Sequence, residues 1–406
     1  MMHVVFVAPQ FSPAASQMIE AAASLSGVRV IVISHEPLER LASHIARKVT
    51  GHWRIDNVFD ASQLEAAVRT LATRHGPIAR CFGAMEQLQI PLAIVRERLG
   101  LPGLSSAAAG NFRDKARMKD ALRAAGVPVA RHQLIGSIAD AEALVRTVGF
   151  PIVIKPPAGA GALATHRFDD VASLATFLAA HPPSPHDPML AEEFLRGTEH
   201  SLETVSIGGR PVWHSLTHYH PTPLVVLENA WIQWCVVLPR DVDSPDYDDI
   251  REIGARALTA LGMETGVSHC EWFRRTDGTV AISEIAARPP GAHITTMMSR
   301  ANDMDFVTAW VTLMIHGTFE PPTRQYAVGT VYLRGQGVGR VQEIQGLDSV
   351  QREFGNLICD VRLPERGQSP TGSYEGEGYI MLRHPHTEIV EHAVQRIAAT
   401  VRVPLA

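Results

Sequence analysis

The chain reads Ser268-His-Cys-Glu-Trp-Phe-Arg-Arg-Thr-Asp-Gly-Thr-Val-Ala-Ile-Ser-Glu284 just past its middle. The dipeptide Asp277-Gly278 favours a two-residue hairpin turn of type I′, because both positions of that turn need a positive φ. A hairpin centred on this dipeptide places Glu271 opposite Glu284. Their Cβ atoms are then roughly 5 Å apart on one face, where two like charges repel each other.

The rest of this hairpin is mostly apolar, and the same register pairs Phe273 with Ile282. The two carboxylates should therefore be partly buried, and a buried charge is costly unless something neutralises it. A divalent cation is one neutraliser, since hard cations such as Mg²⁺ take oxygen ligands. A proton shared by the two carboxylates is the other. The hairpin by itself leaves both interpretations open.

Composition indicates a soluble globular protein. The 406 residues are 46% hydrophobic and 19% charged, with a net charge of −5, which suits sizeable cores and two or three domains. Basic residues form no block, so we expect no nucleic-acid partner. Apolar runs are too short for a membrane span. The four cysteines are scattered without a C-x-x-C pair, which indicates reduced thiols and a cytoplasmic protein.

The N-terminal part alternates between apolar strands and amphipathic helices. Strands are expected at 3–9, 28–34 and 78–82, and helices at 15–25, 64–74 and 90–99. This alternation predicts a parallel sheet with helices on both faces. The first strand-to-helix turn, residues 8–13, contains no glycine, which excludes the glycine-rich fingerprint of an NAD site there.

Two lysines and a glycine-rich loop suggest a phosphate site. Lys115 lies early in a helix expected over 111–125, and Lys155 ends a buried strand. Gly159 and Gly161 follow in a loop whose backbone N–H groups can bind an anion. The loop is not a Walker A loop, because the order G-K-[ST] is absent. Many glycine-rich loops are plain turns, but the position directly after Lys155 favours phosphate binding.

Acidic residues follow on the next two expected strands. Glu192 and Glu193 lie on the first of them, and Glu199 and Glu203 share one face of the second, because side chains alternate along a strand. A solvated strand edge is the alternative to a functional role. Arg288 lies four positions past Glu284. It is either a counter-ion for the two opposed carboxylates or a clamp for an anionic substrate group, which a planar guanidinium suits.

Three histidines, His214, His218 and His220, lie at even-numbered positions of a further expected strand and therefore share one of its faces. They raise a zinc hypothesis, but no fourth ligand is evident, and strand histidines more often line a cleft or face solvent. We take His218, Glu228 and His293 as candidates for contacts with a substrate. A structural salt bridge for Glu228 and a hydrogen-bonded loop role for His293 are the alternatives.

The C-terminal part follows Pro321-Pro322, which marks a linker. Strands are expected at 327–333, 339–344, 358–363 and 378–382, with a closing helix at 388–401. In their order along the chain, these features resemble the ATP-grasp superfamily, in particular its carboxylate–amine ligases such as L-amino acid ligases, which also resemble biotin carboxylase. The resemblance covers about 111–293.

The resemblance implies a mixed α/β and α+β architecture. A Rossmann-like pre-ATP-grasp domain would occupy 1–110, an ATP-grasp domain 111–320 with its lid subdomain at about 130–195, and a β-rich subdomain 321–406. It further implies an ATP-dependent ligase that forms an amide or peptide bond through an acyl phosphate and releases ADP and phosphate. The substrates would be a small-molecule carboxylate and an amine, both of them amino acids. A homodimer is common among related enzymes.

The resemblance also implies roles for matching residues. The residues that would bind ATP are Lys115, Lys155, Gly159, Gly161, Glu192, Glu193, Phe194, Leu195 and Glu199. Within this set, the lysines and glycines would contact the phosphates, the segment from Glu192 to Leu195 the adenine, and Glu199 the ribose. Glu271 and Glu284 would hold Mg²⁺, for which Mn²⁺ can substitute. Arg288 would be the catalytic arginine that steadies the acyl phosphate.

One position departs from the family pattern. Two residues after the second metal-binding glutamate, the family often has Asn as a further ligand, and this chain has Ala286. The departure puts a second Mg²⁺ in doubt, and it keeps a catalytically silent ATP-binding protein as an alternative. A biotin-carboxylase-like carboxylase is the other alternative. The sequence carries no biotin-attachment stretch, so that reaction would need one on another chain.

Overall fold

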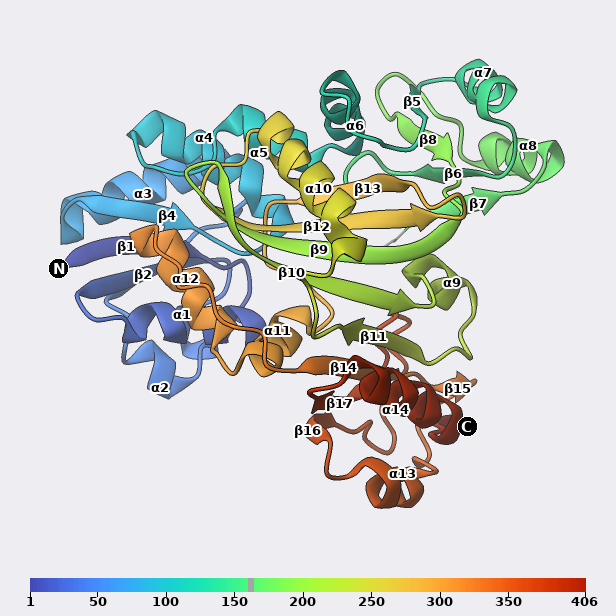
Figure 1. Cartoon of the computed structure of the whole chain (residues 1–406). Helices are drawn as coiled ribbons and strands as arrows, with labels where there is room; N and C mark the ends of the chain where they lie inside the picture. Colours follow the sequence, from blue (N-terminus) through green and yellow to red (C-terminus); the bar gives the residue numbers. More distant parts are fainter. Residues whose placement is uncertain (160–163) are drawn as a thin grey trace.

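A four-stranded parallel sheet forms the N-terminal part of the molecule (Figure 1). The computed structural model describes residues 1–159 and 164–406. Side chains of the first strand alternate between two cores: Val4 and Phe6 enter one, and Val5 and Val7 enter the other. The sheet is therefore apolar on both faces, as predicted. In the order β3-β2-β1-β4 its strands span Gly51–Arg54, Val28–Ser34, Met2–Val7 and Ile78–Phe82.

Helices cover both faces of this sheet. α1 (Pro13–Ser24) and α2 (Ser43–Ala46) contribute to the core on one face, and α3 (Ala61–His75) and α4 (Gln89–Leu99) to the core on the other. Two short 3-10 helices, η1 (Leu38–Arg40) and η2 (Glu86–Leu88), interrupt the loops. The later helix α12 (Phe306–His316) joins the first face, where Trp310 meets Phe82 with ring centroids 5.9 Å apart.

An eight-stranded antiparallel sheet runs through the rest of the molecule. Three of its strands come from the C-terminal region that the sequence marks as β-rich, so this region continues the central sheet. In the order β13-β12-β9-β10-β11-β14-β17-β16 the strands span Val280–Ala286, Gly266–Arg275, Gly197–Ile207, Arg210–His220, Trp234–Leu238, Ala327–Leu333, Gly378–His384 and Ile358–Arg362.

Helices also cover this sheet on both faces. α10 (Asp248–Leu261) packs on the face that includes Leu202 and Leu216, and α11 (Ile294–Asn302) packs on the opposite face. α13 (Leu347–Phe354) and α14 (Thr387–Thr400) cover the C-terminal strands. The packing of α14 is close: a Cβ at Gly329 would lie 2.5 Å from Val394 Cγ1.

The strand expected at 339–344 is not formed. The backbone takes a φ of 107° at Gly337 and 117° at Gly339, values that break an extended run. Val341 makes only an isolated bridge to Leu405. A short parallel pair takes the place of the expected strand, with β15 (Gln336–Gly337) beside β18 (Pro404–Leu405).

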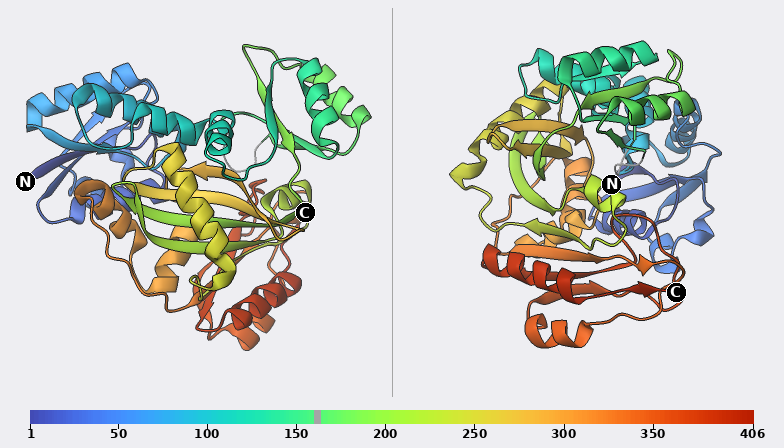
Figure 2. Two further views of the ribbon diagram at one scale, coloured as in Figure 1. Left: turned by 45° about the horizontal axis from the view of Figure 1, so that its top comes forward. Right: turned by 90° about the vertical axis from the view of Figure 1, so that its right-hand side faces the viewer.

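A smaller four-stranded sheet stands at one end of the large sheet (Figure 2). α7 (Ile138–Val148) and α8 (Val171–Ala180) pack on one of its faces. In the order β5-β8-β6-β7 the small sheet spans His132–Ile135, Met189–Glu193, Ile152–Lys155 and His166–Phe168.

The remaining helical elements of the molecule are α5 (Ser106–Arg113), α6 (Lys115–Ala124), α9 (Pro223–Glu228) and η3 (Pro245–Tyr247). Among the described residues, each helix is too short or too polar to cross a bilayer.

Candidate active site

The hairpin of β12 and β13 places Glu271 opposite Glu284, as predicted. Its turn, however, differs from the expected type I′. Gly278 has a φ of 85°, whereas Asp277 stays in the negative-φ region. The N–H of Gly278 donates to the carbonyl oxygen of Arg275 at 2.9 Å. These features describe a three-residue hairpin loop, which is one residue longer than predicted.

The longer loop shifts the register near the turn by one residue. Ile282 faces Trp272, and the predicted pairing of Ile282 with Phe273 is therefore wrong. A β-bulge between Glu271 and Trp272 takes up the extra residue and restores the predicted register beyond it. A bulge places two residues of one strand against one of its partner, which turns later side chains to the other face. The carboxylate pair thus depends on the bulge as well as on the turn.

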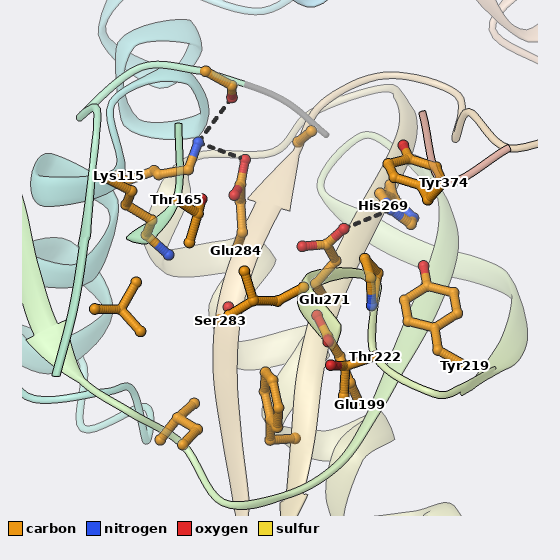
Figure 3. Close-up of a pocket in the computed structure, with 18 of the residues that line it drawn as sticks. Lys115, Thr165, Glu199, Tyr219, Thr222, His269, Glu271, Ser283, Glu284 and Tyr374 are labelled. Carbon is orange, nitrogen blue, oxygen red and sulfur yellow. Dashed lines mark hydrogen bonds and ion pairs between the residues drawn. The ribbon is translucent and has the colours of Figure 1, made fainter. Parts of the chain in front are cut away.

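A cavity of about 770 Å³ opens above the two carboxylates (Figure 3). This volume lies in the usual range for small-molecule sites. Its walls come from the large sheet, the small sheet and the loop after β4. Gly161 lies outside the described residues. The predicted residues that line the cavity are Lys115, Lys155, Gly159, Glu192, Glu193, Phe194, Leu195, Glu199, Glu271, Glu284 and Arg288.

Lys115 reaches the cavity because a helix starts at this residue. The single helix expected over 111–125 is two helices, since the Asp114 carboxylate accepts hydrogen bonds from the N–H groups of Ala116 and Arg117 and caps α6. Lys115 Nζ lies 2.9 Å from Glu284 Oε1 and donates to the carbonyl oxygen of Gly159 at 2.8 Å. One ammonium group therefore joins the carboxylate pair to the start of the glycine-rich loop (Figure 3).

Glu192 lies between two buried lysines. It forms an ion pair with Lys155, at the end of β6, and its Oε2 lies 3.1 Å from Lys119 Nζ. Burial acts to raise the pKa of Glu192, but Lys119 and Lys155 hold it at about 2. The side chain of Lys119 is 0% exposed and also donates to the carbonyl oxygen of Ser283 at 2.7 Å. Lys119 was not among the predicted site residues, although its spacing of four from Lys115 places both on one helix face.

We expect Glu192→Gln to lower the free energy of unfolding by about 3–5 kcal/mol, because it leaves two buried ammonium groups without their anion. The control is Glu193→Gln, one residue later. Glu193 pairs with Arg131, whose side chain is 57% exposed, so its loss should cost at most about 1 kcal/mol. Urea unfolding curves measure both. Equal losses of unfolding free energy in the two variants would contradict the prediction that Glu192 neutralises the two buried lysines.

The donor set around the hairpin fits a divalent cation. Burial and the charge of Glu271 raise the pKa of Glu199 well above its usual value. Burial also acts to raise the pKa of Glu271, but His269 and the nearby lysines lower it. Three acids, Glu199, Glu271 and Glu284, thus line one end of the cavity. Carboxylate oxygens in this arrangement are suitable ligands for Mg²⁺ or Mn²⁺.

A buried chain of polar contacts leads to Glu271. His269 Nδ1 lies 2.8 Å from Glu203 Oε1, and His269 Nε2 lies 3.5 Å from Glu271 Oε1. Ser201 and Thr217 donate hydroxyl hydrogen bonds to Glu203, at 2.6 and 3.0 Å. Glu203, which is fully buried, therefore fixes one side of the imidazole. The imidazole in turn fixes the Glu271 carboxylate (Figure 3).

His269 lies opposite Ala286, the position that departs from the family pattern. The two residues face each other across β12 and β13, so the imidazole lies on the face where the family pattern places Asn. The role of His269 was not predicted from the sequence. The signal was its spacing of two from Glu271, which places both side chains on one face of a strand.

We expect Glu203→Gln to weaken binding of Mn²⁺ to the ligand-free protein by about 10–100-fold, the usual effect of removing a group that orients a metal ligand. Electron paramagnetic resonance of free Mn²⁺ measures this affinity. The control is Glu264→Gln, on the loop before β12 and outside the cavity lining. An unchanged Mn²⁺ affinity in Glu203→Gln would show that Glu271 needs no support from His269.

Arg288 forms its ion pair away from the opposed carboxylates. Its Nε and Nη2 both lie 3.1 Å from Glu86 Oε2. The interpretation of Arg288 as their counter-ion is therefore wrong. Glu86 is buried in η2 and also binds Arg113, whose Nη1 lies 2.9 Å from Glu86 Oε1. Glu86 thus holds Arg288 at the cavity wall.

Three predicted substrate residues lie outside the cavity lining. Tyr219 lines the cavity, so its neighbour His218 points to the other face of β10. Glu228 is exposed at the end of α9. His293 packs at a tilt against Tyr379, with ring centroids 4.4 Å apart. We therefore withdraw all three residues as substrate contacts.

Comparison with known proteins supports the ATP-grasp resemblance. Residues 120–302 match the family model of the ATP-grasp domain. An L-arginine-specific L-amino acid ligase of Bacillus subtilis is 25% identical over 279 residues, which cover 67% of this chain and 65% of that protein. The chain thus spans about two thirds of the length of this relative. A D-alanine–D-alanine ligase of Neisseria meningitidis is 24% identical over 233 residues, which cover 56% of this chain and 72% of that protein.

Solved structures show the same fold. The crystal structure of an L-amino acid ligase from Bacillus licheniformis aligns with a TM-score of 0.78 and 19% identity, covering 100% of this chain and 99% of that one. The biotin carboxylase domain of a Hydrogenobacter thermophilus carboxylase, in complex with MgADP, aligns with a TM-score of 0.66 and 16% identity, covering 98% and 90%. The predicted fold class is confirmed.

Proposed function

We propose that this chain, which carries an ATP-grasp domain at residues 120–302, is an ATP-dependent ligase that joins a carboxylate to an amine. The observation that carries the proposal is the cavity itself. It combines two opposed acids, Glu271 and Glu284, with Lys115, Lys155 and Arg288. A site of this composition suits the transfer of a phosphoryl group, in which negative charge must be neutralised as it develops.

In the proposed reaction, a substrate carboxylate attacks the γ-phosphate of ATP and displaces ADP. The resulting acyl phosphate reacts with an amine, which forms the amide and releases phosphate. Lys115 and Lys155 would bind the phosphates, and Arg288 would bind the acyl phosphate oxygens as a bidentate donor.

Glu271 and Glu284 would hold Mg²⁺, which would supply positive charge to the phosphate groups. The chain fixes these two ligands from different sides: Lys115 contacts Glu284, and His269 contacts Glu271. Ala286 offers no ligand atom at the family's third position. We therefore propose one tightly held metal ion, with Mn²⁺ as a substitute.

A phosphate-release screen tests the proposal. The purified chain is incubated with Mg-ATP and pairs of amino acids and small carboxylic acids. Release that requires both an acid and an amine, with an amide found by mass spectrometry, supports ligation. Release that requires bicarbonate instead would indicate a carboxylase. Nucleotide binding without turnover across the screen would indicate the silent ATP-binding protein.

A further inference from the structure

We propose a zinc site formed by His218, His220 and Glu391, independent of the ligase site. The two histidines belong to the alternating run in β10 that the ligase function leaves unexplained. The third group comes from α14, far along the chain. The candidate ligand atoms of the three residues all lie within 4.8 Å of one another.

The sheet register explains why these residues meet. His218 lies opposite Val237 and His220 opposite Cys235 in the neighbouring strand β11. Val237 and Cys235 belong to the core that α14 covers. The histidines therefore lie on the α14 side of the sheet, at the position where Glu391 extends from the helix. The cavity lies on the other face, which Tyr219 lines.

The chemistry of the three groups favours zinc. Burial lowers the pKa of His218 to about 4. A neutral imidazole is able to bind a metal. Two imidazoles and a carboxylate, with a water in the fourth position, form a common tetrahedral zinc set. Mg²⁺ prefers oxygen ligands and is a poor match.

The surroundings fix one ligand and leave the others adjustable. Tyr247 O–H lies 3.1 Å from His218 Nε2, and such a contact orients a histidine while its second nitrogen remains for an ion. His220 is exposed and Glu391 half-buried, so both can move. The ligand atoms need to approach to about 3.3 Å from each other for bonds of about 2.0 Å to one ion. His214, the third histidine of the run, is not one of the three candidate ligands. Its Nε2 lies 3.2 Å from the carbonyl oxygen of Val242.

The site would join the central part of the large sheet to the C-terminal helix. β10 and α14 are then cross-linked by an ion on the face opposite the cavity. A role in joining these two elements fits that position better than a role in the reaction, since the ligands have no access to the proposed substrates.

Zinc binding to the full-length chain tests this proposal. Metal-free protein carrying Glu284→Gln is titrated with Zn²⁺ against a chromogenic chelator, so that an ion at the carboxylate pair does not add to the count. We expect one equivalent to bind. Adding His220→Ala or Glu391→Gln should weaken Zn²⁺ affinity more than about 100-fold. Changes to residues that only hold a metal ligand in place already lower metal affinity about 10–100-fold. Adding His214→Ala should leave it unchanged.

Co²⁺ provides a second measurement. Bound to the same protein, it should show the intense visible absorption of a tetrahedral site, and His220→Ala should abolish that band. His220 is exposed and Glu391 is half-buried, so the variants should fold, and circular dichroism checks this. Zinc binding that is equally tight in His220→Ala, or a Co²⁺ spectrum without the tetrahedral band, would overturn the proposal.

Discussion

Glu284→Gln should lower the rate of ADP release that depends on the carboxylate substrate by about 10³-fold, the upper range for removing one electrostatic group from an active site. The substitution keeps the size of the side chain but removes its charge. Two contacts would then change: the proposed metal ion would lose one of its two opposed carboxylates, and Lys115 Nζ, 2.9 Å from Glu284 Oε1, would lose its anion. Initial rates at saturating ATP measure the loss.

Mn²⁺ binding separates the two contacts. If Glu284 is a metal ligand, the variant should bind Mn²⁺ far more weakly than the unaltered protein in the absence of nucleotide. The matched control is Glu252→Gln on α10, which lies outside the cavity lining. A Glu284→Gln protein with normal Mn²⁺ affinity and normal turnover would remove Glu284 from the metal site.

Arg288→Met should lower the rate of amide formation by about 10²–10³-fold, the cost of losing one preorganised group for developing charge. Arg288 lines the cavity and is held there by Glu86. Methionine keeps the apolar stem and removes the guanidinium. Product formation followed by mass spectrometry measures the rate. ATP affinity should change much less, because the proposed contact is with the acyl phosphate.

Arg113 provides the control for this variant. It binds the same Glu86 carboxylate, at 2.9 Å, but is not among the residues that line the cavity. Arg113→Met should therefore alter amide formation only a few-fold, through the looser hold on Arg288. Equal losses in the two variants would mean that the contribution of Arg288 is its ion pair with Glu86 and not contact with the substrate.

Features set by neighbouring residues could be predicted from the sequence. The opposition of Glu271 and Glu284 depends on one hairpin, and its prediction is correct because a β-bulge offsets the extra residue in the loop. The details of the turn were not predicted, because Asp277-Gly278 suits more than one loop length. The split at Asp114 was likewise missed, although Asp is a common residue at the start of a helix.

Features set by contacts between distant segments could not be predicted in this way. Glu86 lies on a loop of the parallel sheet, and nothing nearby in sequence indicates its contact with Arg288. The same holds for Glu203, whose partner His269 is on another strand, and for Glu391, whose proximity to His220 requires knowledge of how α14 packs. In each case the residue types were visible, but their partners depended on the tertiary fold.

The continuity of the large sheet has a consequence for how the chain can be divided. β11 pairs with β14 along its full length from Trp234 to Leu238, and those residues are buried. A chain that ended at the linker before β14 would leave the backbone N–H and C=O groups on the β14 side of β11 unpaired beside apolar side chains, while those on the β10 side would stay paired. Exposed edges of this kind promote aggregation. The C-terminal strands therefore protect the central sheet from self-association, and the linker at Pro321-Pro322 is not a point where the chain can be cut into two soluble pieces.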